Sequence, residues 1–197
     1  MPSKTLPTSG QLVILSGPSG VGKSTIVAEL LERFAGRLRL SVSATTRPPR
    51  PGEVPGEQYH FLSSEEFADR REAGEFLECM EVFGRGYWYG TLLGEVRPSL
   101  AEGQWVILEI DVDGAKEARR QFPEVVSIFI TVDSEEELER RLRDRQTDSE
   151  EAIRRRLEVA RHEMAQADSY TYQVVNSDIE TTVGAIADIL IEEGLEK

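Results

Sequence analysis

Short apolar runs alternate with helical patterns along most of the chain. Runs rich in valine, isoleucine and leucine, with little polar alternation, predict strands that are buried on both faces of a parallel sheet. We expect these strands at residues 11–16, 39–43, 104–110, 125–132 and 173–176. Apolar positions that recur every three or four residues predict helices near residues 24–35, 114–121, 134–145, 150–167 and 179–194. This alternation predicts an α/β fold in which helices cover both faces of the sheet.

One region, residues 44–98, interrupts the alternation with glycine, proline, aromatic and charged residues. Its pattern predicts an inserted lobe of short strands with one helix near residues 64–73. Ligands of open α/β sheets bind beyond the carboxyl ends of the strands. An insertion at this point could therefore form a second binding surface.

The charge balance narrows the class of ligand. The 197 residues carry a formal net charge of −13, whereas a nucleic-acid-binding protein needs a positive face that displaces counterions. We therefore expect no nucleic acid partner. Small anionic ligands remain compatible with this charge, because the arginines are clustered in the sequence.

Other features of the composition indicate a cytoplasmic protein. No apolar run approaches the roughly 20 residues that are needed to cross a bilayer, so we expect no membrane partner. The first ten residues, MPSKTLPTSG, lack the apolar segment of a secretory signal, and we expect residues 1–9 to be a disordered tail. The single cysteine, Cys79, cannot form an internal disulfide, which fits a reducing compartment.

A glycine-rich loop follows the first predicted strand and has the spacing Gly17-x-x-x-x-Gly22-Lys23-Ser24. Glycines let such a loop fold tightly with its N–H groups pointing inward, and the next helix adds the positive end of its dipole. Lys23 could reach the β- and γ-phosphates of a nucleotide, and the hydroxyl of Ser24 could ligate Mg²⁺. The residues expected to bind ATP here are Gly17, Pro18, Ser19, Gly20, Val21, Gly22, Lys23, Ser24 and Thr25.

Carboxylates stand at the end of the predicted strand 106-VILEID-111. Phosphate-binding loops usually pair with an acid on a neighbouring strand near the Mg²⁺. Asp111 is the candidate, and Glu109 lies on the same strand face two residues earlier. The residues alone do not decide which acid has which role, and an exposed acid at a strand end is the alternative.

A second candidate anion site lies in 45-TTRPPRPG-52. Its prolines favour the polyproline II conformation, which has three residues per turn, so Arg47 and Arg50 would project on one side about 9 Å apart. Two guanidinium groups suit a phosphate, and Tyr59 could add a hydroxyl. The alternative is a proline-rich ligand of an SH3-type domain, but the position directly after a core strand favours a phosphate site.

The segment 75-EFLECMEVFGRGYWYGT-91 combines carboxylates with aromatic residues and could recognise a base. One carboxylate can accept both adjacent donors of guanine, whereas adenine presents an acceptor at the same place and would be rejected. Glu78, Tyr89 and Thr91 have the required chemistry. From chemistry alone, Glu75 or Glu81 serves as well as Glu78.

Taken together, the motifs resemble those of the guanylate kinase family from about residue 10 to residue 194. They are GPSGVGKST, SVSATTRPPRPGE, YHF, EFLE, YGT, ILEIDVDGA, RRLRDRQTDSEEAIRRRL and VVNSD, in the order of the family. The resemblance implies a P-loop NTPase-type parallel sheet core flanked by helices, with an inserted mixed α/β GMP-binding lobe and a helical lid. It also implies direct, in-line phosphoryl transfer from ATP to GMP with Mg²⁺, in purine nucleotide metabolism.

The resemblance further implies a division of the chain and roles for its residues. The single domain 10–197 would comprise a core (10–43, 99–140 and 160–197), the GMP-binding lobe (44–98) and the lid (141–159). The implied GMP-phosphate ligands are Ser43, Arg47, Arg50, Tyr59 and Tyr89. Glu78 and Thr91 would read guanine, with Glu109 and Asp111 close to the base and the metal. The lid residues over the ATP phosphates would be Arg141, Arg145 and Arg156, with Asn176 near adenine.

The expected catalytic residues are Lys23, Arg47, Arg141, Arg145 and Arg156. The expected metal ligands are Ser24 and Asp111. Arg141 and Arg145 are four residues apart on a predicted helix and so share a face, where guanidinium groups could stabilise the transferring phosphoryl group. The alternative for this pair is exposed ion pairing with residues 135–137.

The chain also departs from the family pattern in two places. Asp144 and Gln146 flank Arg145 where glycines are common in the family, and the loop 84–90 is two residues longer than its commonest form. These departures bear on lid hinging and on the placement of Tyr89 and Thr91.

Three rival functions follow from the same motifs. A non-catalytic scaffold module would typically have a damaged glycine-rich loop, whereas Lys23 and Ser24 are intact. A kinase for another phosphorylated acceptor, such as a ribose bisphosphate, would not need Glu78 with Thr91. A plain ATPase would leave the inserted lobe unexplained. Acceptance of dGMP and assembly into a homodimer are both compatible with the sequence.

Overall fold

The computed structural model describes residues 6, 7, 9–82, 86–143 and 150–196. Its main sheet has five parallel strands in the order β2-β7-β1-β8-β9. They are β1 (Leu12–Ser16), β2 (Leu38–Leu40), β7 (Trp105–Glu109), β8 (Val126–Thr131) and β9 (Tyr172–Val175). Each lies at or within a few residues of a predicted strand, and the predicted parallel α/β core is confirmed.

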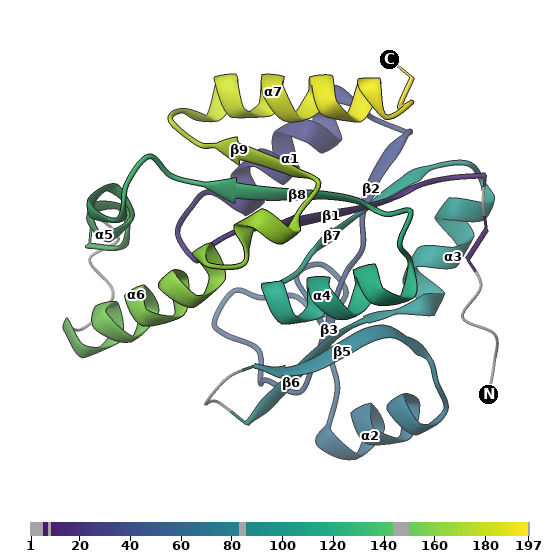
Figure 1. Ribbon diagram of the computed structural model, residues 1–197. Coiled ribbons are helices and arrows are strands. Elements are labelled where there is room, and N and C mark those ends of the chain that lie inside the picture. Colours follow the sequence, from purple (N-terminus) through teal and green to yellow (C-terminus); the bar gives the residue numbers. More distant parts are fainter. Residues whose placement is uncertain (1–5, 8, 83–85, 144–149, 197) are drawn as a thin grey trace.

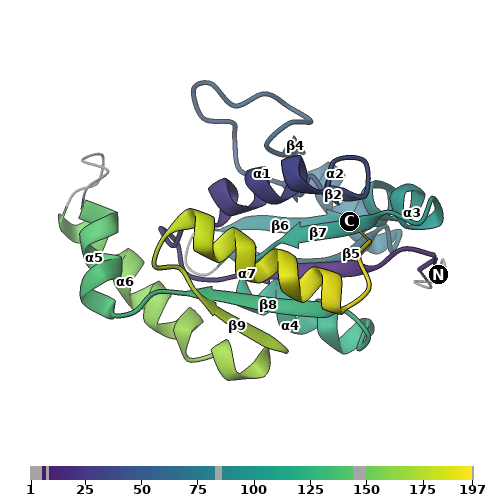
Figure 2. The same ribbon diagram turned by 90° about the horizontal axis from the view of Figure 1, so that it is seen from above.

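The helices that cover this sheet are α1 (Lys23–Arg33), α3 (Leu93–Ala101), α4 (Val112–Gln121) and α7 (Ile179–Glu192). Figures 1 and 2 show α1 and α7 on one face of the sheet, and Figure 1 shows α3 and α4 on the other. The glycine-rich loop joins β1, in the middle of the sheet, to α1. It therefore lies at the carboxyl end of the central strand, where ligands of such sheets bind.

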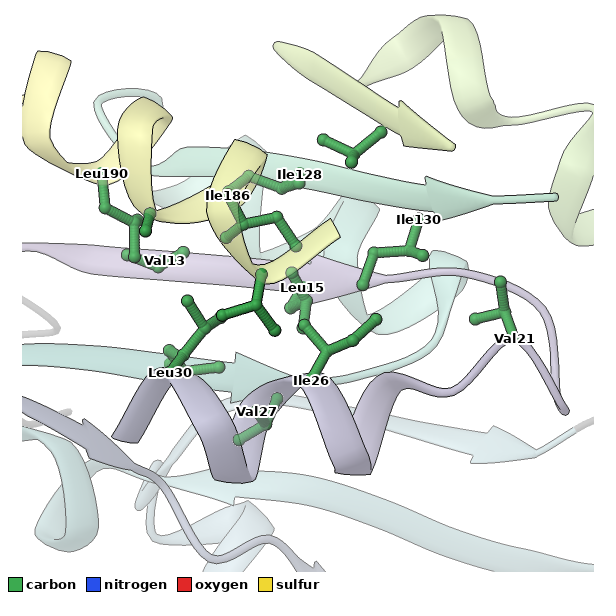
Figure 3. Packing of buried hydrophobic residues seen from close by; sticks show 14 of the residues in the cluster. Val13, Leu15, Val21, Ile26, Val27, Leu30, Ile128, Ile130, Ile186 and Leu190 are labelled. Atoms are coloured by element: carbon green, nitrogen blue, oxygen red, sulfur yellow. The ribbon is translucent and has the colours of Figure 1, made fainter. Parts of the chain in front are cut away.

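Successive residues of β1 point to opposite faces, as the two-residue period of a strand requires. Val13 and Leu15 pack with side chains of α1 and α7 in one buried cluster, which Figure 3 shows from close by. Leu12 and Ile14 pack with side chains of α3 and α4 in a second cluster. Because both faces are buried, the strand has no polar alternation, which is why the sequence reads as a continuous apolar run.

The inserted lobe contains a second, mixed sheet in the order β4-β3-β6-β5. Its elements are β3 (Ala44–Thr45), β4 (His60–Phe61), α2 (Ser64–Glu72), β5 (Phe76–Val82) and β6 (Tyr87–Leu92). The expected helix near 64–73 is present, and it begins with a capping box between Ser63 and Glu66. Strand β5 begins directly after Glu75 and pairs with β6. These two strands contain several of the candidate site residues.

One helix of this region was missed by the sequence analysis, which expected a single helix in residues 44–98. Helix α3 begins at Leu93 and buries Leu93, Val96 and Leu100 in the second core cluster. Gly94 and Pro98 weaken its helical signal in the sequence, because both residues disfavour helix interiors. The helix therefore follows the lobe directly and packs on the core.

Two more helices, α5 (Glu135–Arg143) and α6 (Glu150–Met164), precede the short 3₁₀ helix η1 (Ala167–Ser169). They project beside the carboxyl ends of the core strands, at the left of Figure 1. Leu138 and Leu142 of α5 pack with Ile153 and Leu157 of α6 in the first core cluster. Within the described part of the chain, no helix is long and apolar enough to span a membrane.

Candidate active site

The glycine-rich loop takes a backbone shape that few other residues could adopt. Gly17, Gly20 and Gly22 have φ angles of 152°, 96° and 96°, which lie in the region that glycine favours. A Cβ atom on Gly17 would also lie 2.2 Å from the carbonyl oxygen of Ile130 in β8. A side chain at position 17 would therefore not fit between the loop and the neighbouring strand.

Lys23 folds back over the loop that precedes it. Its Nζ donates hydrogen bonds to the carbonyl oxygen of Gly17 at 2.6 Å and to that of Pro18 at 3.2 Å. Because Lys23 is also the first residue of α1, its ammonium group and the helix N-terminus present positive charge on the same loop. This is the arrangement that attracts a phosphate chain.

Asn176, which the family resemblance places near adenine, has a buried side chain that holds the glycine-rich loop. Its Nδ2 donates to the carbonyl oxygen of Val21 at 2.6 Å, and its Oδ1 accepts from the hydroxyl of Thr182 at 2.9 Å. Each of these two atoms is thus already committed to the packing around the loop. The structure thus gives Asn176 a loop-supporting contact that the sequence did not reveal.

The two acids at the end of β7 differ in their contacts. The hydroxyl of Ser24 donates to Oε1 of Glu109 at 3.0 Å. Asp111 caps α4, because its Oδ1 accepts from the backbone N–H of Gly114 at 2.8 Å. Burial raises the pKa of Asp111, while the nearby Lys23 lowers it in part. Both carboxylates therefore lie within the electrostatic reach of the loop.

The oxygen atoms here match the preference of Mg²⁺ for hydroxyl, carboxylate and phosphate ligands. Among the residues that the structure describes, no group of three or more His, Cys, Asp or Glu side chains could hold a metal by itself. A Mg²⁺ ion in this place would therefore depend on nucleotide phosphates and water in addition to protein oxygens, as is common for this ion.

Glu78 is the carboxylate that the fold buries in the inserted lobe. It pairs with Thr91 across β5 and β6, and the Thr91 hydroxyl donates to its Oε1 at 2.8 Å. Burial raises the pKa of Glu78 to about 7, with Thr91 lowering it and the nearby Asp111 raising it. Glu75 and Glu81 are exposed, so burial and the partner both distinguish Glu78 from the two acids that the sequence left as alternatives.

Gly114, at the start of α4, is a site residue that the sequence analysis missed. A Cβ atom there would lie 2.9 Å from Oε2 of Glu78 and 3.4 Å from Oδ1 of Asp111. The absence of a side chain therefore leaves room for both carboxylates. The motif DVDGA does not indicate that its glycine has this role.

If Glu78 binds GMP, as the family resemblance implies, Gly114→Ala should raise the KM for GMP about tenfold or more, because the new methyl group must displace the Glu78 carboxylate and a misplaced binding group can cost up to a hundredfold. In helices, alanine otherwise stabilises by about 0.5–1 kcal/mol relative to glycine. Steady-state kinetics with each substrate varied would measure this, with the helical, unobstructed Gly184→Ala as the control. An unchanged KM for GMP would show that Glu78 can move without consequence.

Arg47 is buried, which differs from the projecting arginine pair expected from the prolines. Its guanidinium donates to both carboxylate oxygens of Glu53 at 2.9 and 2.8 Å and lies 5.4 Å from the ring centroid of Tyr59. The side chain of Arg50 is exposed instead. The two arginines thus have different surroundings, and one of them is already held by a carboxylate.

A tight turn explains how Glu53 reaches Arg47. The backbone N–H of Glu53 donates to the carbonyl oxygen of Arg50 at 3.1 Å, with Pro51 and Gly52 between them and a φ of 87° at Gly52. Proline followed by a glycine of positive φ is typical of a type II turn. The sequence shows the proline and glycine of this turn, but it does not show that Glu53 pairs with Arg47.

The remaining expected phosphate ligands gather around this pair. The rings of Tyr59 and Tyr89 pack edge to face with centroids 5.7 Å apart. Tyr89 lies opposite Thr45 in the lobe sheet, and Ser43 directly precedes that strand. Ser43 and Arg47 therefore flank the short strand β3, while Tyr89 in β6 and Tyr59 before β4 lie beside it.

Two of the candidate lid arginines, Arg141 and Arg156, lie on α5 and α6. The Nε of Arg141 donates to Oε1 of Glu137 at 2.7 Å, and its Nη2 donates to the carbonyl oxygen of Asn176 at 2.9 Å. Arg141 thus makes the ion pair of the alternative interpretation and also reaches the strand edge beside the glycine-rich loop. Arg156 donates to the hydroxyl of Ser19 at 2.7 Å.

Three residues of the lid prediction, Asp144, Arg145 and Gln146, lie outside the described residues, as do 84 and 85 of the longer loop. Most of the expected disordered tail is outside them as well.

Comparison with known proteins adds independent information. A family model described as guanylate kinase matches residues 9–193. The guanylate kinase of Rhodopirellula baltica is 51% identical over 186 residues, which cover 93% of this chain and 88% of that protein. The guanylate kinase of a Nostoc species is 50% identical over 184 residues, covering 93% and 91%. The crystal structure of guanylate kinase from Anaplasma phagocytophilum aligns with a TM-score of 0.78 at 36% identity, covering 98% of this chain and 90% of that one.

Proposed function

The chain belongs to the guanylate kinase family and phosphorylates GMP to GDP with ATP, and we propose that its residues divide into a donor site, an acceptor site and a lid. The donor site is the glycine-rich loop, residues 17–25. The acceptor site lies between the inserted lobe and the core. The lid comprises residues 141–159, and residues 10–43, 99–140 and 160–197 form the core.

The observation that carries this proposal is the meeting of both sites at the end of β7. Ser24 of the glycine-rich loop donates to Glu109. Two residues further on, Asp111 lies close enough to the buried Glu78 to raise its pKa. Donor and acceptor groups from distant parts of the chain therefore converge on one short segment, which is the geometry that a transfer between two bound nucleotides needs.

On the donor side, Lys23 would leave its loop carbonyls to bind the β- and γ-phosphates of ATP. The backbone N–H groups of the loop and the N-terminus of α1 would bind the phosphate chain. Ser24 and Asp111, with Glu109 beside them, would hold Mg²⁺. When bound, the metal would neutralise phosphate charge and orient the γ-phosphoryl group.

On the acceptor side, Ser43, Arg47, Arg50, Tyr59 and Tyr89 would bind the phosphate of GMP. Glu53 holds the guanidinium of Arg47 with two hydrogen bonds, which orients it before the substrate arrives. A guanidinium that is already oriented loses less entropy when it binds a phosphate.

The base would be read by Glu78 and Thr91. An ionised Glu78 can accept from the two adjacent donors of guanine, and the Thr91 hydroxyl can serve the oxygen of the base. Because this carboxylate is buried, a base with an acceptor at the same position would leave both groups without partners, which is strongly unfavourable.

The reaction proposed is a direct, in-line transfer. The acceptor phosphate is already an anion near neutral pH, so neither a covalent intermediate nor a strong general base is needed. The difficulty is the mutual repulsion of two polyanions, which Lys23, Arg47 and the arginines of the lid would neutralise. Arg141 and Arg156, with Arg145, would reach the ATP phosphates as the lid closes and excludes water.

Release of ADP from ATP and Mg²⁺ tests this proposal, with GMP, AMP, UMP, a ribose phosphate or no acceptor. We expect strong turnover with GMP, poor turnover with AMP and negligible hydrolysis. Chelating the Mg²⁺ should lower GMP-dependent turnover by about a hundredfold or more, because the metal supplies several kcal/mol of charge stabilisation. Equal turnover of AMP and GMP would contradict the role of Glu78, and turnover that survives chelation would contradict the metal site.

Several broader features belong to the same proposal. The acidic charge and the single cysteine fit a cytoplasmic enzyme of purine nucleotide metabolism that acts on small molecules without a nucleic acid or membrane partner. The donor and acceptor sites are each built from one chain, so a homodimer would not be needed for catalysis. Including dGMP among the acceptors would show whether the ribose hydroxyl is recognised.

A further inference from the structure

A buried threonine on α7 connects this helix to the glycine-rich loop through one asparagine. Thr182 is 1% exposed, and its hydroxyl donates to Oδ1 of Asn176 at 2.9 Å. Asn176 in turn donates from Nδ2 to the carbonyl oxygen of Val21 in the loop at 2.6 Å. Helices α7 and α1 lie on the same face of the sheet (Figures 1 and 2), so this short relay spans from one to the start of the other. None of the donor, acceptor or lid roles given above uses Thr182.

The ordinary explanation of a threonine inside a helix is a bond to the backbone of its own helix. The hydroxyl of Thr182 does lie 2.6 Å from the carbonyl oxygen of Asp178, four residues earlier, as threonine hydroxyls in helices often do. That carbonyl oxygen already accepts the backbone N–H of Thr182 at 3.1 Å, so it has a partner without the hydroxyl. For the buried Oδ1 of Asn176, the Thr182 hydroxyl is the donor that it receives within the described residues.

This donor favours one orientation of the Asn176 amide. An asparagine side chain presents an oxygen acceptor on one side and an NH₂ donor on the other. The carbonyl of Val21 can only accept, so Nδ2 must face it, and Oδ1 then faces Thr182. Without the hydroxyl, Oδ1 would be buried with no partner in this orientation, which is costly.

The backbone of Asn176 is fixed separately from its side chain. Its N–H donates to the carbonyl oxygen of Thr131 at the end of β8, and its carbonyl oxygen accepts from Arg141 of α5, each at 2.9 Å. Only the side-chain torsions of Asn176 therefore remain to be set, and Thr182 is placed to set them.

The orientation of this amide matters for the shape of the loop. A trans peptide is planar, with its C=O and N–H on opposite sides. When Asn176 holds the carbonyl of Val21, the N–H of Gly22 therefore points away from Asn176. Gly22 has a φ of 96° and no side chain that would restrict this peptide. Backbone N–H groups of such loops are the groups that bind phosphates, so their direction affects the affinity for a nucleotide.

We propose that Thr182 is a positioning residue for the donor site. It orients the amide of Asn176, which holds the peptide between Val21 and Gly22 in the direction that receives the ATP phosphates. Thr182 acts through Asn176 and does not touch the nucleotide. The inference rests on the proposed assignment of residues 17–25 to ATP.

Two variants of the full chain separate the hydroxyl from the packing of this side chain. Thr182→Val replaces the hydroxyl with a methyl group, whereas Thr182→Ser keeps the hydroxyl and loses the methyl group. In Thr182→Val we expect the Kd and the KM for ATP to rise about tenfold, because losing a buried hydrogen bond lowers the fraction of molecules whose loop can bind. The KM for GMP, and kcat at saturating ATP, should stay close to those of the parent. Thr182→Ser should bind ATP as the parent does.

The matched control is Ser127→Ala, which removes another buried hydroxyl. Ser127 is 1% exposed and accepts the backbone N–H of Thr171 at 3.0 Å. It lies near the start of β8, whereas the loop lies at the carboxyl ends of the strands. Ser127→Ala should lower the melting temperature without a selective change in ATP binding.

Three results would overturn the proposal. They are an ATP Kd in Thr182→Val equal to that of the parent, equal effects of valine and serine, and parallel rises of both KM values that follow the melting temperature. If Thr182→Val does not fold, Thr182→Ala and Thr182→Ser form a second pair that differs only in the hydroxyl, with the same expectations. If the donor assignment itself fails, Lys23→Ala will keep its ATP affinity, which is a separate result.

Discussion

Replacing Lys23 with alanine is expected to reduce GMP phosphorylation to background while GMP still binds. Removing a single group that stabilises developing charge typically costs about a hundred- to a thousandfold in turnover, and here it also removes the ammonium that offsets repulsion between two polyanions. In the free protein this ammonium bonds to the carbonyl oxygens of Gly17 and Pro18. The variant should therefore lose the phosphate contact and leave the acceptor site unchanged.

Steady-state turnover and GMP binding by calorimetry would measure this, with Lys116→Ala as the control. Lys116 is an exposed lysine of α4, so its loss changes the net charge equally without touching the loop. Turnover within about tenfold of the parent would refute the role of Lys23, because it falls short of the loss expected for a charge-stabilising group. Loss of GMP binding would show that the two sites are not independent.

Glu78→Gln is expected to lower kcat/KM for GMP by roughly a thousandfold or more, since sites built around a buried polar contact reject a mismatched partner by about 10⁴–10⁵. The glutamine amide would bring N–H donors against the donors of guanine, and it would disturb the hydrogen bond that Thr91 now donates to Glu78. The preference for GMP over AMP should shrink accordingly. Kinetics with both acceptors would measure this, with the exposed Glu81→Gln as the control.

The pH dependence of the parent gives this prediction a second readout. The folded pKa of Glu78, about 7, is raised above its ordinary value of 4.5. Guanine requires the ionised form, so the KM for GMP should rise as the pH falls below about 7, and Glu78→Gln should lack this component. The phosphate of GMP titrates equally in both proteins and cancels in the comparison.

Ionisation of Glu78 favours GMP binding but lowers the stability of the folded protein. Because the raised pKa favours the protonated form in the folded state, Glu78 lowers the free energy of unfolding progressively between pH 4.5 and about 7. Above pH 7 the variant should thus be at least as stable as the parent. A large loss of stability at pH 8 would show that Glu78 has a structural role instead of a binding role.

The pattern of apolar positions was sufficient for the core elements but less so for their ends and for the lobe. The parallel strands were predicted because both faces are buried, which leaves continuous apolar runs in the sequence. β2 ends at Leu40, earlier than predicted. The prediction extended too far because no residue in 41-SVS-43 marks the end of the pairing with β7. Helix α3 was missed because Gly94 and Pro98 weaken its helical signal.

For the site, the sequence by itself determined the features that are contiguous in the chain. The glycine-rich loop needs only a strand, a tight turn and a helix in succession, so one short motif specifies Gly17, Lys23 and Ser24. The family resemblance then named the acceptor lobe and its chemistry, and the comparisons confirmed the family.

Only the tertiary structure decided which groups meet. Glu78 and Thr91 are paired across two strands and lie beside Asp111 and Gly114 from a third segment. Glu53 folds back to Arg47, and Arg156 reaches Ser19 across most of the chain length. Hydrogen bonds and burial depend on distances in space, which the packing of sheets and helices sets. No local pattern of residues encodes them.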